Sequence, residues 1–126
     1  MKRIVISIGG GRQALAQFAR TWRRASGGER LPEATPRLEF ASLAELLSAL
    51  TPKRLALLDA LAAQSGFSIR ALAGKLGRDY KNVHGDVSVL IELGLIERRA
   101  DSTLKAPYDE LVIHAPLTAA ARRRAA

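Results

Sequence analysis

The chain has 126 residues, of which 48% are hydrophobic and 25% are charged. This length fits one compact domain or a small module with an appendage. It is too short for a Rossmann oxidoreductase, a TIM barrel or a kinase. It contains no cysteine, which excludes disulfides, thiolate zinc sites, iron–sulfur clusters and cysteine nucleophiles. The net charge of +8 gathers at both ends, because the first 28 residues hold six basic and no acidic side chains and residues 122–124 are all arginine; this balance favours a polyanionic partner such as nucleic acid, an acidic protein or anionic lipid.

The N-terminal part of the chain predicts a β-α-β-α element. Residues 2–8 are rich in Ile and Val and predict a strand, and residues 12–25 predict a helix after a Gly-rich turn. The apolar face of that helix consists of Leu15, Phe18, Ala19 and Trp22. Residues 37–41 predict a second strand that pairs with the first, and Ser42 with Glu45 predicts a capping box for a short helix.

Three capped helices are predicted after this element. Thr51 begins the first, which runs to about residue 64, while Ser68 caps the second and Asp79 caps the third. The second and third helices are separated by a tight turn at Gly77 and Arg78, where glycine permits a positive φ. An apolar residue is more usual than an arginine directly after such a glycine, so Arg78 departs from the pattern.

The chain changes to a β pattern after residue 94. Residues 95–98 and 103–106 flank a turn and predict a hairpin, and residues 111–114 predict a third strand. Three helices followed by a hairpin describe a winged helix-turn-helix, with an ordinary helical hairpin in a globular core as the alternative. We therefore expect an α+β protein.

The predicted elements divide the chain into three parts. Residues 1–50 are expected to form a dimerisation element, because two short strands and one helix cannot bury both faces alone; docking onto its own chain, in a monomer, is the alternative. Residues 51–117 are expected to form the winged helix-turn-helix domain. Residues 118–126 form a basic tail, which either adds phosphate contacts or stays solvated.

The segments LTPKRLALLDAL and SIRALAGKLGRDYKNVHGDVSVLIELGLIER, with the ending YDELVI, resemble winged-helix transcriptional regulators of the MarR-like type. They are most similar to a family of small prokaryotic DNA-binding proteins that are often proposed as antitoxins encoded beside a toxin. The N-terminal strand–helix–strand is similar to that family too. The resemblance implies a dimeric repressor, with autoregulation of an operon and binding of a partner toxin as further implications.

The third helix is expected to place its N-terminal half in the major groove of DNA. Its contacting side chains are predicted to be Tyr80, Lys81, Asn82, His84 and Ser88. Asn82 can bond adenine in a bidentate manner and Lys81 can reach guanine or a phosphate; the alternatives are solvation for these two and packing at the helix start for Tyr80. Glycine inside a helix costs about 1 kcal/mol against alanine, so Gly85 either allows close approach of DNA or has no role.

Five further cations are candidates for contacts with the DNA backbone or the minor groove. They are Arg70, Arg78, Arg98, Arg99 and Lys105. Arg70 lies near the start of the second helix, where phosphate contacts are common, and Arg78 is expected to present its charge from the turn. Arg98 and Arg99 are neighbours on a strand and cannot face the same side, so only one of them is expected to reach DNA.

These features predict a sequence-specific regulator of transcription that binds double-stranded DNA and acts as a repressor and a homodimer. Two alternatives stay open: an antitoxin that mainly neutralises a partner toxin by protein contact, and a non-specific architectural or RNA-binding winged helix with a steep salt dependence. An enzyme is not expected, because His84 and His114 are the only imidazoles and no nucleophile elbow or metal-spaced carboxylate cluster exists. We expect no cofactor and no metal. No apolar run approaches the ~20 residues of a membrane span, so we expect a soluble, cytoplasmic protein without a membrane partner.

Overall fold

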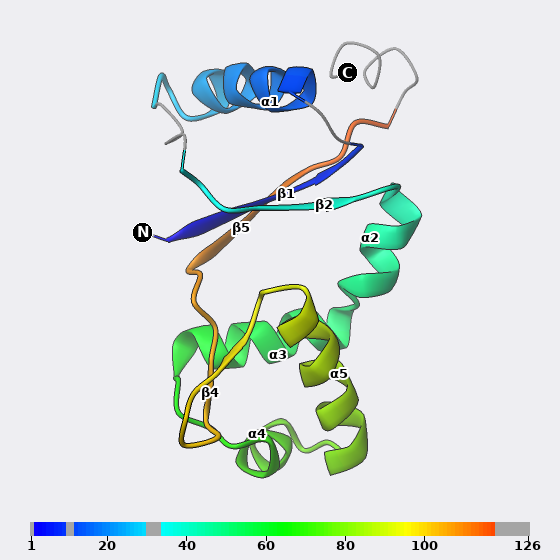
Figure 1. Cartoon of the computed structure of the whole chain (residues 1–126), viewed down its shortest axis with the longest axis vertical. Helices are drawn as coiled ribbons and strands as arrows, with labels where there is room; N and C mark the ends of the chain where they lie inside the picture. The colour runs from blue at the N-terminus through cyan, green and yellow to red at the C-terminus, as the bar shows by residue number, and fades with distance from the viewer. Residues whose placement is uncertain (1, 10–11, 30–33, 118–126) are drawn as a thin grey trace. The chain divides into compact units, whose positions relative to one another are not determined.

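The computed structural model describes residues 2–9, 12–29 and 34–117, with the predicted tail at 118–126 outside these ranges (Figure 1). The fold is α+β, as predicted. It divides into two compact units. The sheet unit combines Arg3–Leu47 with the residues from Glu110 onward, and the helical unit contains Ser48–Asp109. Among the described helices, none has the length and apolar character that a membrane crossing requires.

The sheet unit is built around a buried central strand. β1 (Arg3–Ile8) lies between β2 (Arg37–Phe40) and β5 (Glu110–His114), and both pairings are parallel. Every residue of β1 after the first is buried, which explains why this segment reads as a nearly continuous apolar run. The predicted pairing of the first two strands is therefore confirmed.

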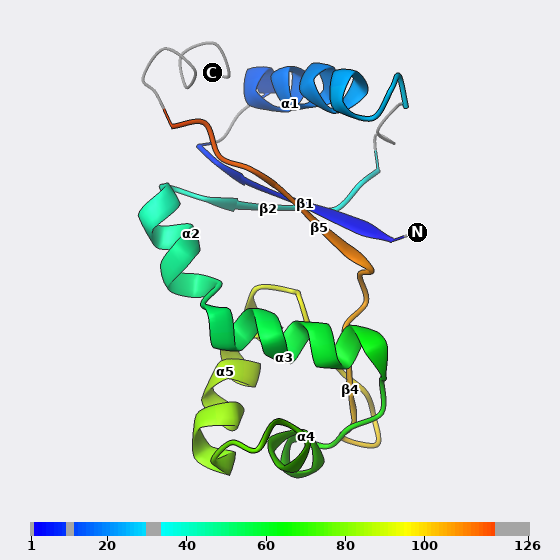
Figure 2. The same ribbon diagram turned by 180° about the vertical axis from the view of Figure 1, so that it is seen from behind.

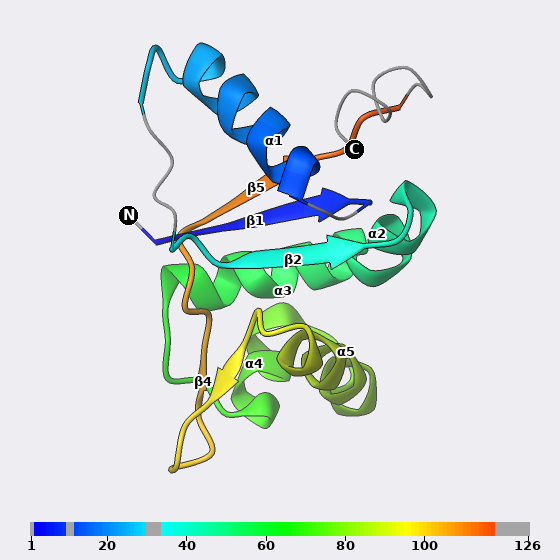
Figure 3. The ribbon, with the colours of Figure 1, turned by 45° about the horizontal axis from the view of Figure 1, so that its top comes forward.

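The helix α1 (Arg12–Ala25) packs on one face of this sheet (Figure 3). Phe18 and Trp22 stack with ring centroids 6.4 Å apart and pack with Val5 and Val112 of the strands. The predicted apolar face is thus confirmed at these two aromatic residues, while the side chain of Leu15 lies outside the described part. Arg3 covers Trp22, with its guanidinium 5.0 Å from the ring centroid.

The C-terminal strand β5 does not belong where we expected it. We expected residues 111–114 within the 51–117 domain, whereas Val112 aligns with Val5 of β1 and the strand completes the sheet unit. A short apolar strand carries no signal for its partner, and strand-rich composition alone cannot locate it. His114, at the end of β5, makes an edge-on contact with Phe18 at 5.3 Å, and burial lowers the pKa of this histidine.

The predicted capping box is observed at the start of α2 (Leu43–Ala49). The Ser42 hydroxyl accepts a hydrogen bond from the Glu45 amide at 3.1 Å, and the Glu45 carboxylate accepts one from the Ala41 amide at 3.2 Å. The carboxylate thus reaches one residue further back than in the usual reciprocal pair. One backbone donor in the first turn of the helix and one just before the helix are satisfied in this way.

The helical unit contains α3 (Pro52–Ala63), α4 (Ile69–Leu76) and α5 (Tyr80–Glu92), followed by the short antiparallel strands β3 (Glu97–Arg98) and β4 (Leu104–Lys105) (Figure 2). Its core is aliphatic, and the fully buried side chains are Leu57, Leu61, Leu72, Val83, Val87, Leu90, Leu95, Ile96 and Leu104. These come from all three helices and from the chain that follows α5. Burial of this size is the main stabilising contribution to such a unit.

The three predicted caps of these helices are confirmed. The Thr51 hydroxyl accepts from the Arg54 amide, the Ser68 hydroxyl accepts from the Ala71 amide, and the Asp79 carboxylate accepts from the Lys81 amide. Gly77 ends α4 with φ 63° and ψ 35°, the left-handed conformation that the turn between α4 and α5 requires. These local signals fix the length of the turn and therefore the relation between the two helices.

We predict opposite effects for alanine at two glycines of this region. A Cβ at Gly77 or at Gly74 would meet no atom within 4 Å, so packing does not decide either result. Gly77→Ala places a side chain in the left-handed region and should lower the free energy of unfolding by about 1 kcal/mol. Gly74 lies within the regular helix α4, so Gly74→Ala should raise the free energy of unfolding by about 0.5–1 kcal/mol. Urea denaturation followed by circular dichroism measures both, and a shift of the same sign for the two variants would contradict this account.

Candidate functional site

The helix α5 presents two different faces. Val83, Val87 and Leu90 are buried in the core of the helical unit, and their spacing is that of one helical stripe. The opposite side is exposed, and its predicted contact residues are Tyr80, Lys81, Asn82, His84 and Ser88. All five side chains are exposed, and Tyr80, His84 and Ser88 follow one another at four-residue spacing along one stripe of the helix. The Ser88 hydroxyl donates to the backbone carbonyl of His84 at 2.9 Å.

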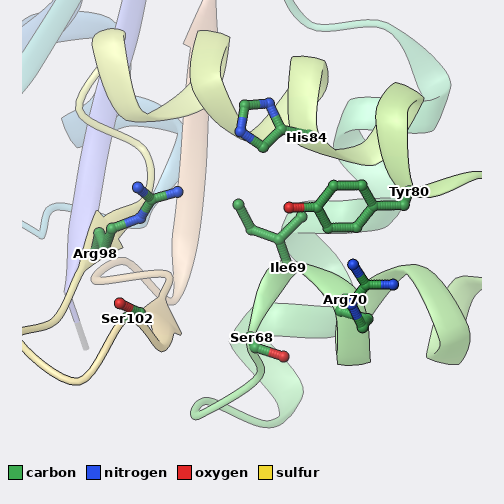
Figure 4. Close-up of a pocket in the computed structure, with 7 residues that line it drawn as sticks. All are labelled: Ser68, Ile69, Arg70, Tyr80, His84, Arg98 and Ser102. Atoms are coloured by element: carbon green, nitrogen blue, oxygen red, sulfur yellow. The ribbon is translucent and has the colours of Figure 1, made fainter.

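A pocket of about 310 Å³ lies between α4, α5 and the β3–β4 hairpin (Figure 4). Its walls are formed by Ser68, Ile69, Arg70, Tyr80, His84, Arg98 and Ser102. Four of these residues, two arginines and two aromatic side chains, were predicted as contacts from sequence. The pocket thus joins residues from three elements into one concave surface.

The two aromatic residues of the pocket, Tyr80 and His84, lie side by side on α5, and Arg70 packs against the Tyr80 ring. Tyr80 and His84 are one helical turn apart on α5, and their ring centroids are 5.9 Å apart. The guanidinium of Arg70, from the first turn of α4, lies 4.8 Å from the centroid of the Tyr80 ring, a distance at which cation–π attraction acts. The Tyr80 hydroxyl points toward the middle of the pocket (Figure 4).

Arg78 does not take the position that we expected. Its Nη2 donates to Asp86 Oδ2 at 2.7 Å, and its side chain is only 19% exposed. Arg54 of α3 binds the other oxygen of the same carboxylate at 3.0 Å. The side chain of Arg78, which we expected to meet a phosphate from the turn, is thus neutralised by Asp86 within the protein.

The network of Arg54, Asp86 and Arg78 also explains the unusual arginine after the turn glycine. Burial alone would raise the pKa of Asp86, but the hydrogen bonds from Arg78 and Arg54, together with their charges, lower it. The carboxylate therefore stays ionised and connects α3, the α4–α5 turn and α5. The sequence contained both partners, but the spacing of eight residues between Arg78 and Asp86 did not indicate that they meet.

The hairpin directs only one of its two adjacent arginines into the pocket. Arg98 forms part of the wall, whereas Arg99 and Lys105 do not. Asp101 stabilises the turn between β3 and β4. Its carboxylate accepts hydrogen bonds from the hydroxyl and the amide of Thr103, at 2.6 and 3.0 Å. These hydrogen bonds lower the pKa of Asp101. Ser102 adopts a positive φ of 68° in this turn and reaches the pocket wall.

The cations of this surface differ in whether an acid compensates them. Within the described residues, the structure records no ion pair for Arg70, Lys81, Arg98, Arg99 or Lys105, whereas Arg54 and Arg78 share Asp86. A concave surface lined by uncompensated cations concentrates positive potential. The pocket is therefore suited to an anionic group.

Three residues of the pocket were missed as functional candidates: Ser68, Ile69 and Ser102. Ser68 was recognised only as a helix cap, although a cap and the first-turn residue Arg70 necessarily lie at the same helix end. Ser102 could not be found, because its position depends on how the hairpin folds back. Within the described ranges, no cluster of His, Asp and Glu residues could hold a metal ion.

The family profile HVO_A0114 matches residues 49–113, which is 65 of 126 residues and so just over half of the chain. The matched segment contains α3, α4, α5 and the β3–β4 hairpin, and it includes every residue of the pocket. None of the curated proteins compared with the chain matches it.

We predict that Asp86→Ala lowers the free energy of unfolding by about 2–3 kcal/mol, because it leaves two partly buried guanidinium groups without their carboxylate. Asp59→Ala, which removes an exposed carboxylate from α3, is the control and should change stability by less than about 0.5 kcal/mol. Because the pKa of Asp86 in the folded chain is below its ordinary value of 3.8, its stabilising contribution is complete above that value and is lost as the pH falls through the folded pKa. Urea titrations at neutral and acidic pH measure this, and equal acid sensitivity of the wild type and Asp86→Ala would contradict it.

Proposed function

The chain belongs to the HVO_A0114 family, and for the segment that this family shares we propose a winged helix-turn-helix that binds double-stranded DNA. In this proposal α4 and α5 form the helix-turn-helix, with α5 entering the major groove, and the β3–β4 hairpin is the wing. The protein acts as a cytoplasmic, sequence-specific regulator of transcription, and as a repressor.

One observation carries the proposal: within α5, from Tyr80 to Val89, the only carboxylate is Asp86, and Arg54 and Arg78 each pair with one of its oxygens. The other carboxylate near the start of the helix, Asp79, is the N-cap and accepts a hydrogen bond from the Lys81 amide. An uncompensated acid within the helix would repel the phosphates of DNA. The pairing of Asp86 therefore removes one repulsion that would otherwise oppose binding.

The exposed residues fit two different roles in this complex. Lys81 and Asn82, in the first turn of α5, are placed to read base edges, where each good bidentate contact discriminates by about 1–3 kcal/mol. Arg70 of α4 and Arg98 of the hairpin line the pocket beside that helix and suit backbone phosphates, which position the protein without reading sequence. Arg99 and Lys105 add charge on the hairpin.

A homodimer is the assembly that we propose for reading two half-sites. The sheet unit is the proposed dimerisation element, although its third strand comes from β5 and not from a second subunit. β2 and β5 are the outer strands of the described sheet, and an outer strand presents unpaired backbone groups.

A second candidate function is the binding of an acidic partner protein such as a toxin, and it rests on a different surface. Arg20, Arg23 and Arg24 of α1 line a cavity of about 470 Å³. Clustered arginines are enriched at protein interfaces and recognise carboxylates. Co-purification of a stable partner that Arg23→Glu abolishes, in a protein that selects no DNA sequence, would favour this function over the first.

We predict that the full chain enriches a defined sequence from a random duplex library, and that Lys81→Ala or Asn82→Ala relaxes the preference at one base position by about 1–3 kcal/mol. The control is Lys53→Ala, which removes an exposed lysine at the start of α3 and should leave the preference unchanged. Competitive fluorescence anisotropy with single-base variants of the enriched duplex measures it. Absence of binding to every duplex at low salt would contradict the proposal.

We also predict that Gly85→Ala separates stability from DNA binding. Gly85 is exposed and lies one turn after Lys81 on α5. A Cβ at this position would meet no protein atom within 4 Å. The variant should raise the free energy of unfolding by about 0.5–1 kcal/mol through helix propensity, yet weaken DNA binding by about 1 kcal/mol because the methyl group obstructs the groove. Gly74→Ala, the matched control on α4, should stabilise without affecting DNA binding. Unchanged DNA affinity in Gly85→Ala would mean that DNA does not approach this turn.

A further inference from the structure

The pocket between α4, α5 and the hairpin is a concave space lined by residues of all three elements. Its volume of about 310 Å³ lies at the lower end of the roughly 300–1,000 Å³ range of small-molecule sites. Ile69, which is buried, gives the pocket one apolar wall, and the remaining walls are polar or aromatic. Figure 4 shows Arg98 on one side of this space and Arg70 on the other, with His84 on α5 above them and Tyr80 directly above Arg70.

The charge of the pocket suits a doubly charged anion. Arg70 and Arg98 both line it and have no ion pair with any described residue. A carboxylate offsets one positive charge, whereas a phosphomonoester carries about −1.5 to −2 at pH 7 and accepts bidentate hydrogen bonds from guanidinium groups. Two arginines on opposite walls therefore favour a phosphate monoester.

The start of α4 adds backbone donors to the same wall. The first amides of a helix have no partner within it. Ser68 satisfies those of Ala71 and Leu72, with its hydroxyl and its carbonyl, which leaves the amides of Ile69 and Arg70 without a helical partner. The helix dipole adds positive potential at this end.

The aromatic side chains indicate that the ligand also has a planar part. Tyr80 is 41% exposed and lies 5.9 Å from His84, centroid to centroid, with the rings tilted by 45°. Accessible rings of this kind stack with nucleobases. The hydroxyls of Tyr80, Ser68 and Ser102 can donate to the ribose or to the edge of the base.

We propose that this pocket binds a nucleoside monophosphate, with the phosphate between Arg70 and Arg98 and the base against Tyr80 and His84. Binding of the nucleotide depends only on the pocket. Its regulatory consequence rests on the proposed function: a bound nucleotide occupies the cations that would contact the DNA backbone, and so it competes with DNA. The phosphate recognised here is shared by free nucleotides and by DNA, and the experiment separates these sources.

The test is isothermal titration of the full-length chain with adenosine 5′-monophosphate, with adenosine and with inorganic phosphate. The monophosphate should bind at least about tenfold more tightly than either fragment, because each fragment loses one set of contacts. Arg98→Gln should weaken its binding by about tenfold. Arg99→Gln removes the same charge from the adjacent position outside the pocket and should change affinity by less than about twofold. Circular dichroism shows that both variants are folded.

The proposal is overturned if the monophosphate gives no heat and no amide chemical-shift change near Arg70 and Tyr80 at concentrations up to about 10 mM. It is also overturned if adenosine binds equally well, or if Arg99→Gln weakens binding as much as Arg98→Gln. Displacement of the enriched duplex by the monophosphate supports the regulatory consequence. If the chain binds DNA but no nucleotide, this inference is overturned and the proposed function stands. If it binds the nucleotide but no DNA, the proposed function is overturned and the nucleotide site stands.

Discussion

The carboxylate of Asp86 is the constraint on which the candidate surface depends. It lies on α5 between buried apolar residues, and its side chain is only 16% exposed. A charge in such a place is unfavourable unless hydrogen-bonded partners compensate it. Arg54 and Arg78 each bind one of its oxygens, and these bonds tie α5 to α3 and to the α4–α5 turn.

This network divides the arginines of the helical unit into two classes. Arg54 and Arg78 are paired with Asp86 inside the protein, so Asp86 neutralises their charge. Arg70 and Arg98 line the pocket without a carboxylate. Net charge alone could not separate these classes, although the local potential that a polyanion encounters depends on the second class.

Features set by neighbouring residues could be predicted from sequence, and features set by distant residues could not. The caps at Thr51, Ser68 and Asp79 and the left-handed Gly77 depend on three or four adjacent positions, and all are observed. The partner of β5 is β1, more than a hundred residues earlier, and nothing in either strand specifies the other. The same reason explains Arg78 and Ser102, whose roles depend on which groups the folded chain brings near them.

The parallel pairing of β5 with β1 changes what a dimer of this protein can use. Val5 and Ile6 are buried in the central strand, with β2 on one side and β5 on the other, so β1 offers no edge to a second subunit. The connection from β2 to β5 contains α2 and the helical unit, which is therefore inserted in sequence between two strands of one sheet. Pairing strands across so many residues closes a long loop, and non-local contacts of this kind slow folding. In the folded chain, a second subunit can meet the described sheet at the outer strands β2 or β5 or at a face of the sheet.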